Sequence, residues 1–272
     1  MSEPLPAGAC DCAIHVYDPA HGPDAHRLGR VFPWATVAAY RKVQARLGTA
    51  RTVVVQANAY TFDHHVLEHA LAAFGDSARG VAIVGPETPR AELIRLHAAG
   101  VRGARLHLLG ERLLMGWDAV PAVASRIAEL GWHLQIQLDG RTLPEHEAML
   151  RQLPCPLVID HIGKFLEPVP PTHPAFRSLL RLLNGGRCWL KLSSPYEVSR
   201  CGPPDWPDVG ELAREAARAA PARMLWGSNW PHVGTDTPPD DPALLDALTH
   251  WVPDARQRRR ILVDNPAELY GW

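Results

Sequence analysis

The chain has 272 residues, of which 46% are hydrophobic and 21% are charged, a composition typical of a folded globular protein and not of a disordered one. Its 28 basic and 29 acidic side chains give a net charge of −1, so no overall field attracts nucleic acid or an anionic membrane. No apolar run approaches the roughly 18 residues that cross a bilayer. We therefore expect a cytoplasmic protein whose partner is a small molecule.

The number and spacing of the cysteines indicate neither a disulfide framework nor a cysteine-based metal site. The chain has five cysteines, an odd number at irregular spacing. Cys10 and Cys12 form a C-x-C pair, but no second pair follows at the spacing of a zinc site. We expect buried, reduced thiols.

Eight short apolar runs alternate with helical patterns along the chain, and each run is bounded by glycine, proline or polar residues. They cover residues 12–17, 52–58, 80–85, 103–108, 133–138, 157–163, 188–193 and 224–229. Eight β-α units in this length predict an α/β fold, a (β/α)8 TIM barrel formed by one domain over 1–272. An open doubly wound sheet is the alternative, but the first run is not followed by the glycine-rich turn that such sheets use for nucleotides.

Polar residues recur at the ends of seven of these runs, in the two-residue phase that places side chains on one face of a barrel strand. They are His15, Gln56, Asn58, Arg105, His107, Gln135, Gln137, His161, Lys191, Ser193 and Asn229. Any one of them alone could be a buried polar residue whose hydrogen bonds are made within the fold. Their shared position instead predicts a hydrated pocket at the carboxyl ends of the strands, where barrel enzymes place their active sites.

Several motifs carry a family likeness that runs from about residue 9 to the C-terminus. They are "CDCAIHVYDP", "RGARLHLLG", "VIDHIGKF", "WLKLSSPYEVSR", "LWGSNWPH" and "NPAELYG". With them the chain resembles the amidohydrolase superfamily, in the branch of 2-pyrone-4,6-dicarboxylate lactonase, and within that branch it is most similar to the galactarolactone isomerases. The resemblance implies a TIM barrel and an enzyme that acts on a lactone.

The superfamily's metal ligands are mostly replaced in this sequence. Where the resemblance would place a first-strand histidine, a strand-five histidine and a strand-eight aspartate, the chain has Ala13, Gln137 and Asn229. His15 and His161 remain, which is fewer than the three protein ligands that zinc sites normally take. We expect no metal and no other cofactor.

The resemblance and the replaced residues together suggest isomerisation of the lactone of a sugar diacid, from the 1,5- to the 1,4-form. An asparagine has no useful basicity near pH 7, so water would lack its activating base. A hydroxyl group of the substrate needs less activation than water does, because its intramolecular attack on the lactone carbonyl can have an effective molarity of about 10⁵–10⁸ M.

The catalytic residues we assign are His15, His161, Asn229 and His232. His15 and His161 would stabilise the oxyanion, Asn229 would orient the attacking hydroxyl, and His161 or His232 would move its proton.

Substrate binding is assigned to seven further residues. Arg105, Lys164 and Lys191 would hold a carboxylate, and Asn58, Gln137 and Tyr196 would bind hydroxyls. His107 is left open between proton transfer and hydrogen bonding. His232 is open in the same way. A structural role is also open for three of these residues, since Lys164 could be a solvated charge, Arg105 could close a structural ion pair and Tyr196 could only pack in its loop.

Two other functions remain open at this point. The chain could be a lactone hydrolase in which another group replaces the missing aspartate. It could also be a barrel without catalytic activity that only binds a small acid.

Overall fold

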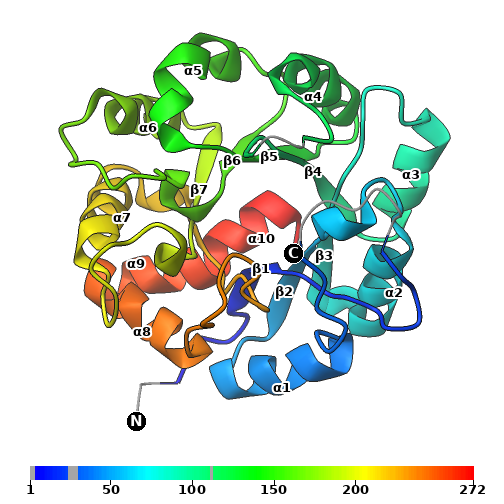
Figure 1. Cartoon of the computed structure of the whole chain (residues 1–272), viewed down its shortest axis with the longest axis horizontal. Helices are drawn as coiled ribbons and strands as arrows, with labels where there is room; N and C mark the ends of the chain where they lie inside the picture. The colour runs from blue at the N-terminus through cyan, green and yellow to red at the C-terminus, as the bar shows by residue number, and fades with distance from the viewer. Residues whose placement is uncertain (1–3, 24–29, 111–112) are drawn as a thin grey trace.

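The computed structural model describes residues 4–23, 30–110 and 113–272 and shows a barrel of eight parallel strands surrounded by helices (Figure 1). The strands are β1 (Cys10–Ile14), β2 (Arg51–Val55), β3 (Ala78–Ala82), β4 (Val101–His107), β5 (His133–Gln137), β6 (Leu157–Ile159), β7 (Cys188–Leu192) and β8 (Met224–Trp226). Each strand pairs in parallel with the next along the chain. The predicted (β/α)8 barrel is therefore confirmed, and the open doubly wound alternative is wrong.

The helices between the strands form the outer layer (Figure 1). They are α1 (Val37–Leu47), α2 (His65–Phe74), α3 (Arg90–Ala98), α4 (Val120–Ala128), α5 (Leu143–Arg151), α6 (Pro174–Asn184) and α7 (Pro207–Ala219). Three further helices follow the last strand: α8 (Asp241–Trp251), which packs beside α1 and α7, then α9 (Ala255–Arg259) and α10 (Asn265–Tyr270). None of the helices in the described part of the chain is long and apolar enough to cross a membrane.

Backbone hydrogen bonds join the first strand to the segment that follows the last one. The amide of Asn229 donates to the carbonyl of Ala13 over 2.8 Å, and the amide of His15 donates to the carbonyl of Trp230 over 2.7 Å. The buried carboxylate of Asp11 accepts from both the amide and the hydroxyl of Ser228, at 2.9 and 2.6 Å. These bonds bring His15 and Asn229 side by side although 214 positions separate them.

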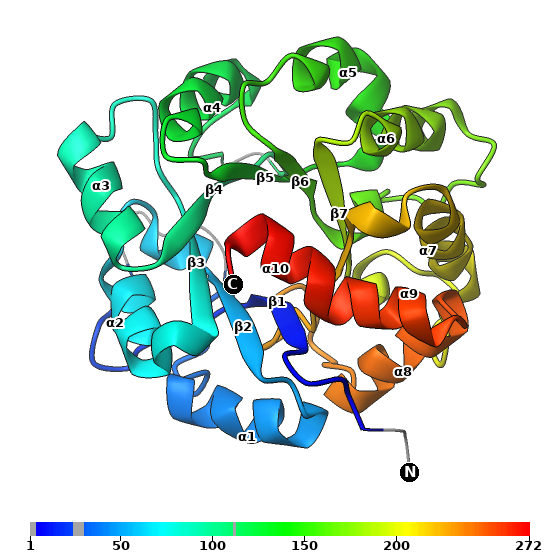
Figure 2. The ribbon, with the colours of Figure 1, turned by 180° about the vertical axis from the view of Figure 1, so that it is seen from behind.

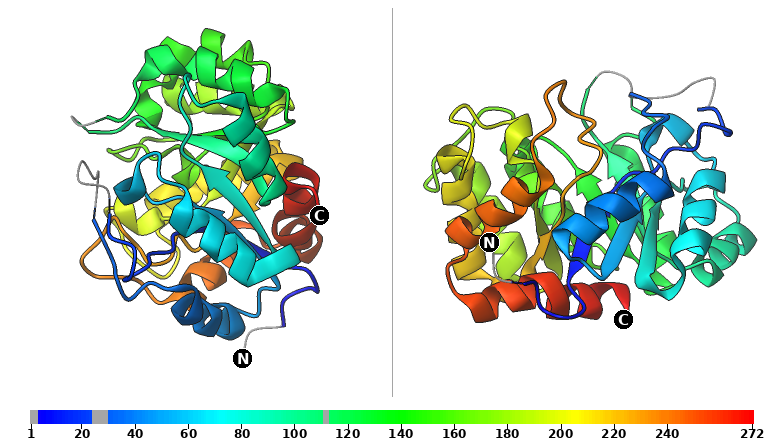
Figure 3. Two further views of the ribbon diagram at one scale, coloured as in Figure 1. Left: turned by 90° about the vertical axis from the view of Figure 1, so that its right-hand side faces the viewer. Right: turned by 90° about the horizontal axis from the view of Figure 1, so that it is seen from below.

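Two helices at the C-terminus close one end of the barrel. Figure 2 shows α9 and α10 crossing in front of the strands, and the right-hand view of Figure 3 places them at the end opposite the strand-to-helix loops. The Tyr270 ring of α10 packs edge-on against His133, the first residue of β5, with 5.2 Å between ring centroids. The amino-terminal end of the barrel is thus filled, which leaves the carboxyl end for a pocket.

The interior of the barrel holds alternate residues of the strands, as the two-residue period requires. Cys10, Cys12, Val53 and Val55 belong to this inner cluster, whereas Val54 packs in the layer between strands and helices. Four of the five cysteines are buried free thiols, as expected, and Cys201 is a free thiol exposed to solvent.

Substitution of Gly103 by alanine is expected to destabilise the barrel strongly. A Cβ at this position of β4 would lie 2.3 Å from the ring of His133, its direct partner on β5. Overpacking of a filled core typically lowers the free energy of unfolding by about 1–3 kcal/mol. Urea unfolding should show this loss, and Gly22→Ala, whose Cβ would meet no atom within 4 Å, should not. An unchanged unfolding midpoint for Gly103→Ala would contradict this packing.

Candidate active site

A cavity of about 560 Å³ opens at the carboxyl ends of the strands. Its lining includes most of the residues that the sequence singled out: His15, Asn58, Arg105, His107, Gln137, His161, Lys164 and Asn229. They come from six different strands or the loops that follow them, so the barrel gathers residues that lie far apart in the sequence. Three predicted site residues, Lys191, Tyr196 and His232, are not among the residues that line this cavity.

Lys191 lies deeper, inside the barrel. Its side chain is fully buried, and its ammonium donates to Gln135 Oε1 over 2.7 Å and lies 3.5 Å from Asp160 Oδ1. The two-residue phase of the strand correctly predicts that the Lys191 side chain faces the barrel interior. However, Lys191 is the fourth residue of β7 and does not reach the lining of the cavity. The structure therefore does not bring Lys191 to the place where a substrate carboxylate would bind.

Tyr196 and His232 form a hydrogen-bonded chain that reaches the pocket at Asn229. The Asn229 amide nitrogen donates to the Tyr196 hydroxyl over 3.1 Å, and that hydroxyl lies 3.1 Å from His232 Nδ1. On its other side, His232 Nε2 lies 3.0 Å from Asp241 Oδ1. Both residues thus contact the site through Asn229.

Asn229 has polar neighbours on three sides. Its side-chain oxygen lies 3.2 Å from His15 Nε2, and its amide nitrogen donates to Tyr196 and, over 3.1 Å, to Glu197 Oε1. The residue has a φ of 62°, a left-handed conformation that asparagine tolerates better than most residues. His161 and Lys164 also adopt positive φ, at 54° and 41°. Strained backbone of this kind concentrates at functional sites.

Glu197 is a functional candidate that the sequence analysis missed. It lies in the loop after β7, next to Tyr196, and lines the pocket with a side chain that is only 5% exposed. Its carboxylate forms an ion pair with Lys164, so that lysine is not a solvated charge. Burial favours a higher pKa for Glu197, but His161 and Lys164 together hold its pKa below the usual range. The available signal was its place inside the "SSPYEVSR" segment, one residue beyond Tyr196.

Arg105 presents a buried positive charge to the pocket. The residue is 5% exposed, and no acidic side chain in the described part of the chain forms an ion pair with it. Its guanidinium donates to the carbonyl of Gln56 over 2.9 Å and to Gln137 Oε1 over 3.2 Å, while Nε has no partner among the described groups. Asp160 attracts the guanidinium electrostatically but forms its ion pair with Lys191. A buried cation without an ion-pair partner is costly, so this arrangement favours an anionic ligand.

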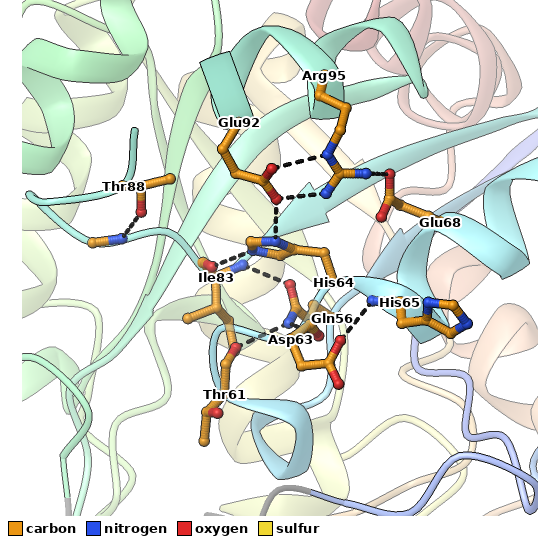
Figure 4. A network of polar contacts seen from close by, with 11 residues as sticks. Gln56, Thr61, Asp63, His64, His65, Glu68, Ile83, Thr88, Glu92 and Arg95 are labelled. Atoms are coloured by element: carbon orange, nitrogen blue, oxygen red, sulfur yellow. Dashed lines mark hydrogen bonds and ion pairs between the residues drawn. The ribbon is translucent and has the colours of Figure 1, made fainter. Parts of the chain in front are cut away.

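The loop after β2 that supports Arg105 is held by a polar network (Figure 4). Gln56 donates to the carbonyls of Thr61 and Asp63 over 2.9 and 2.8 Å and accepts from the amide of Ile83 over 2.9 Å. With its side chain satisfied in this way, Gln56 is a structural residue. Its backbone carbonyl is held in place to accept from Arg105.

The histidines of the pocket are neutral at pH 7. Burial lowers the pKa of His15, His107 and His161 to about 4. The Arg105 guanidinium contributes to the same effect at His15 and His107. Each ring therefore carries one proton and offers one acceptor nitrogen near pH 7.

We expect the free energy of unfolding to fall as the pH drops from about 6.5 to about 4, because unfolded histidines bind protons near pH 6.5 and the buried rings do not. His133, whose pKa burial lowers to about 3, belongs to this group. Asp11, whose pKa burial raises to about 6, acts in the opposite direction but is a single carboxyl group. Urea unfolding at several pH values should show that the free energy of unfolding depends less steeply on pH in His133→Leu than in the parent. Equal slopes for His133→Leu and the parent would contradict a neutral, buried His133.

Comparison with known proteins places this pocket in a family. The amidohydrolase family model matches residues 10–272. The chain belongs to the amidohydrolase family. The 2-pyrone-4,6-dicarboxylate hydrolase of Comamonas testosteroni is 36% identical, with 98% of this chain and 91% of that protein covered. The D-galactarolactone isomerase of Agrobacterium fabrum is 34% identical, over 98% of this chain and 92% of that protein.

A solved structure from Agrobacterium tumefaciens, determined without ligand, has a TM-score of 0.91 and 32% identity, and covers 99% of this chain and 97% of that one. The predicted membership in the lactonase branch is confirmed, and the amidohydrolase is an enzyme, as its curated relatives are. The binding-only alternative has no support from these relatives.

The donor set of this amidohydrolase does not fit the family's metal. No group of three or more histidine, cysteine, aspartate or glutamate side chains in the described ranges could hold an ion. His15 Nδ1 is committed to the carbonyl of Val55 and His161 Nδ1 to the hydroxyl of Ser193, each at 2.8 Å. Glu197 is already paired with Lys164. The groups that remain are fewer than a zinc site needs.

Proposed function

We propose that this amidohydrolase isomerises the lactone of a sugar diacid from the 1,5- to the 1,4-form by intramolecular acyl transfer, without a metal ion. The observation that carries the proposal is Asn229, a neutral amide held at the centre of the pocket. An amide can orient a hydroxyl but cannot deprotonate water near pH 7. The curated relatives named as a galactarolactone isomerase and as a lactone hydrolase support a lactone as the substrate.

The charges of the pocket support a substrate with one carboxylate. Of the cations that line the described part of the cavity, Lys164 is paired with Glu197 and Arg30 with Asp236. Arg105 is then the cation that has no acidic partner among these residues. The free carboxylate of a diacid monolactone would balance it, with two parallel hydrogen bonds available from a guanidinium.

The chemistry proceeds by attack of a ring hydroxyl of the substrate on its own lactone carbonyl. A tetrahedral intermediate forms, the original ring C–O bond breaks, and the released oxygen receives the proton that the attacking hydroxyl lost. His161 and Lys164, which line the cavity, stabilise the developing oxyanion, the contribution that is usually the largest in acyl transfer. Asn58 and Gln137 bind the other hydroxyls.

A lactone hydrolase is the second candidate, and Glu197 is the observation that favours it. Its carboxylate lines the pocket beside Asn229 and is the kind of group that could replace a missing aspartate. However, the ion pair with Lys164 and the lowered pKa make Glu197 a weak base. The geometry therefore supports isomerisation better.

Carbon NMR of D-galactaro-1,5-lactone incubated with the purified enzyme tests the proposal. We expect the 1,4-lactone as the first product, at the same rate before and after dialysis against a chelator. Metal content is measured on the same sample. Prompt formation of the open diacid would establish the hydrolase, and a rate that depends on stoichiometric metal would overturn the proposed mechanism.

A further inference from the structure

The orientation of the Asn229 amide is determined by two independent carboxylates. The first is Glu197, whose Oε1 lies 3.1 Å from the Asn229 side-chain nitrogen. An ionised carboxylate only accepts hydrogen bonds, so the NH2 group of Asn229 must face it. The side-chain oxygen of Asn229 then faces His15.

The second carboxylate is Asp241, which acts through two intermediate residues. Asp241 Oδ1 can only accept, so His232 Nε2 donates to it over 3.0 Å, and in the Nε2–H tautomer His232 Nδ1 is an acceptor. The Tyr196 hydroxyl therefore donates to Nδ1 over 3.1 Å and can accept from the Asn229 NH2 group, also over 3.1 Å. This relay imposes the same amide orientation as Glu197 does.

The proton of the His15 ring is fixed independently of Asn229. His15 Nδ1 lies 2.8 Å from the carbonyl of Val55, which can only accept, so Nδ1 carries the hydrogen. Since burial and the charge of Arg105 keep the pKa of His15 at about 4, the ring holds no second proton at pH 7. His15 Nε2 is thus a bare acceptor.

Two acceptors consequently face each other across 3.2 Å, His15 Nε2 and Asn229 Oδ1, and both residues line the cavity. Such a pair is unfavourable until a donor approaches it. We propose that His15 Nε2 is the group that accepts the proton of the attacking substrate hydroxyl, and that Glu197, Tyr196, His232 and Asp241 are positioning residues that keep the Asn229 oxygen turned toward it. The proposal rests on the function proposed above.

Proton transfer converts the repulsive pair into a hydrogen bond. The hydroxyl first donates into the space between the two acceptors. As its oxygen bonds to the lactone carbon, its proton moves to His15 Nε2, and the resulting N–H donates to Asn229 Oδ1. When the ring C–O bond breaks, Nε2 returns the proton to the leaving oxygen. No other reactant is needed, and His232, which does not line the cavity, has no direct part in the transfer.

Nitrogen NMR of the enzyme labelled with 15N-histidine tests the arrangement without any substrate. The chain has 14 histidines, so the signals of His15 and His232 are assigned by their loss in His15→Gln and His232→Gln. We expect His15 to be protonated on Nδ1 alone and His232 on Nε2 alone at pH 7. A proton on His15 Nε2 would overturn the proposal even if the lactone is isomerised. If the lactone is instead hydrolysed, the function proposed above is wrong. The spectrum still shows in that case which ring nitrogens of His15 and His232 carry a proton.

Variants test the positioning residues. In Asp241→Asn the His232 ring can change its tautomer, and together with Glu197→Gln both constraints on the amide are removed. We expect kcat to fall about tenfold in Asp241→Asn and further in the double variant, with little change in KM, because an incorrect tautomer impairs only the chemical step. Asp241→Glu should recover most of the rate.

The matched control is Asp240→Asn, the same substitution one residue earlier, where the side chain is exposed and paired with Arg46. It should leave both kcat and the His232 spectrum unchanged. A His232 spectrum that does not change in Asp241→Asn, or a loss that appears in KM and not in kcat, would overturn the positioning role.

Discussion

Replacement of Arg105 by methionine is expected to lower kcat/KM for the lactone about 10²- to 10³-fold, the effect of removing one member of a buried pair between a cation and a carboxylate. The loss should appear mainly in KM, because Arg105 holds a carboxylate that takes no part in bond making. The carboxylate of Asp160, which interacts electrostatically with Arg105, keeps its ion pair with Lys191 in the variant, so the melting temperature should not fall sharply. Steady-state kinetics and thermal unfolding measure both quantities.

Two comparisons make this prediction specific. Arg105→Lys keeps the charge and loses the forked geometry, so it should retain part of the activity. A methyl ester of the lactone carboxylate should be a poor substrate for the parent and should lose little more with Arg105→Met. If the ester and the acid lose activity equally in the variant, Arg105 does not bind the carboxylate.

Replacement of Asn229 by aspartate is expected to change the reaction toward hydrolysis. The new carboxylate would stand where the Asn229 nitrogen now lies 3.1 Å from Glu197 Oε1, and two like charges at this distance share a proton. Once that proton leaves, the pair offers a base that can activate water, an effect typically worth about 10²–10⁴-fold. The ratio of open diacid to 1,4-lactone, followed by carbon NMR, should rise by about 10² or more and should increase with pH.

The control for this prediction is Asn229→Ala, which removes the amide without supplying a base and should slow both reactions. Combining Asn229→Asp with Glu197→Gln removes the repulsion and should move the onset of hydrolysis to lower pH. An Asn229→Asp variant that still forms only the 1,4-lactone would show that the residue at this position does not choose between water and the substrate hydroxyl.

The barrel and most of the pocket could be predicted because they depend on local periodicity. Apolar runs that alternate with helical patterns identify the strands, and the two-residue phase identifies the side that faces inward. Seven of the residues that line the cavity lie at the ends of these runs: His15, Asn58, Arg105, His107, Gln137, His161 and Asn229. Several strands stop earlier than the apolar pattern does, β6 at Ile159 and β8 at Trp226, so His161 and Asn229 lie on turns with left-handed backbone.

The parts that could not be predicted depend on how deep a side chain lies in the barrel and on contacts between residues that are far apart in the sequence. The two-residue phase places Lys191 inside the barrel but does not give its height along the barrel axis. Its partners are Gln135 on β5 and Asp160, which directly follows β6. Glu197 lies in a loop with no periodicity after β7, so its approach to Asn229 follows from the pairing of β7 with β8. The relay through Asp241 joins three separate segments and leaves no sequence pattern.

Because the amide in this pocket cannot activate water, we expect the substrate to supply its own nucleophile. The most direct test is isomerisation in water enriched in ¹⁸O, with mass spectrometry of the lactone formed early in the reaction. We expect a 1,4-lactone that carries no solvent oxygen. Incorporation of ¹⁸O into that lactone would show that water opens the ring before it closes again, and that the substrate hydroxyl is not the first nucleophile.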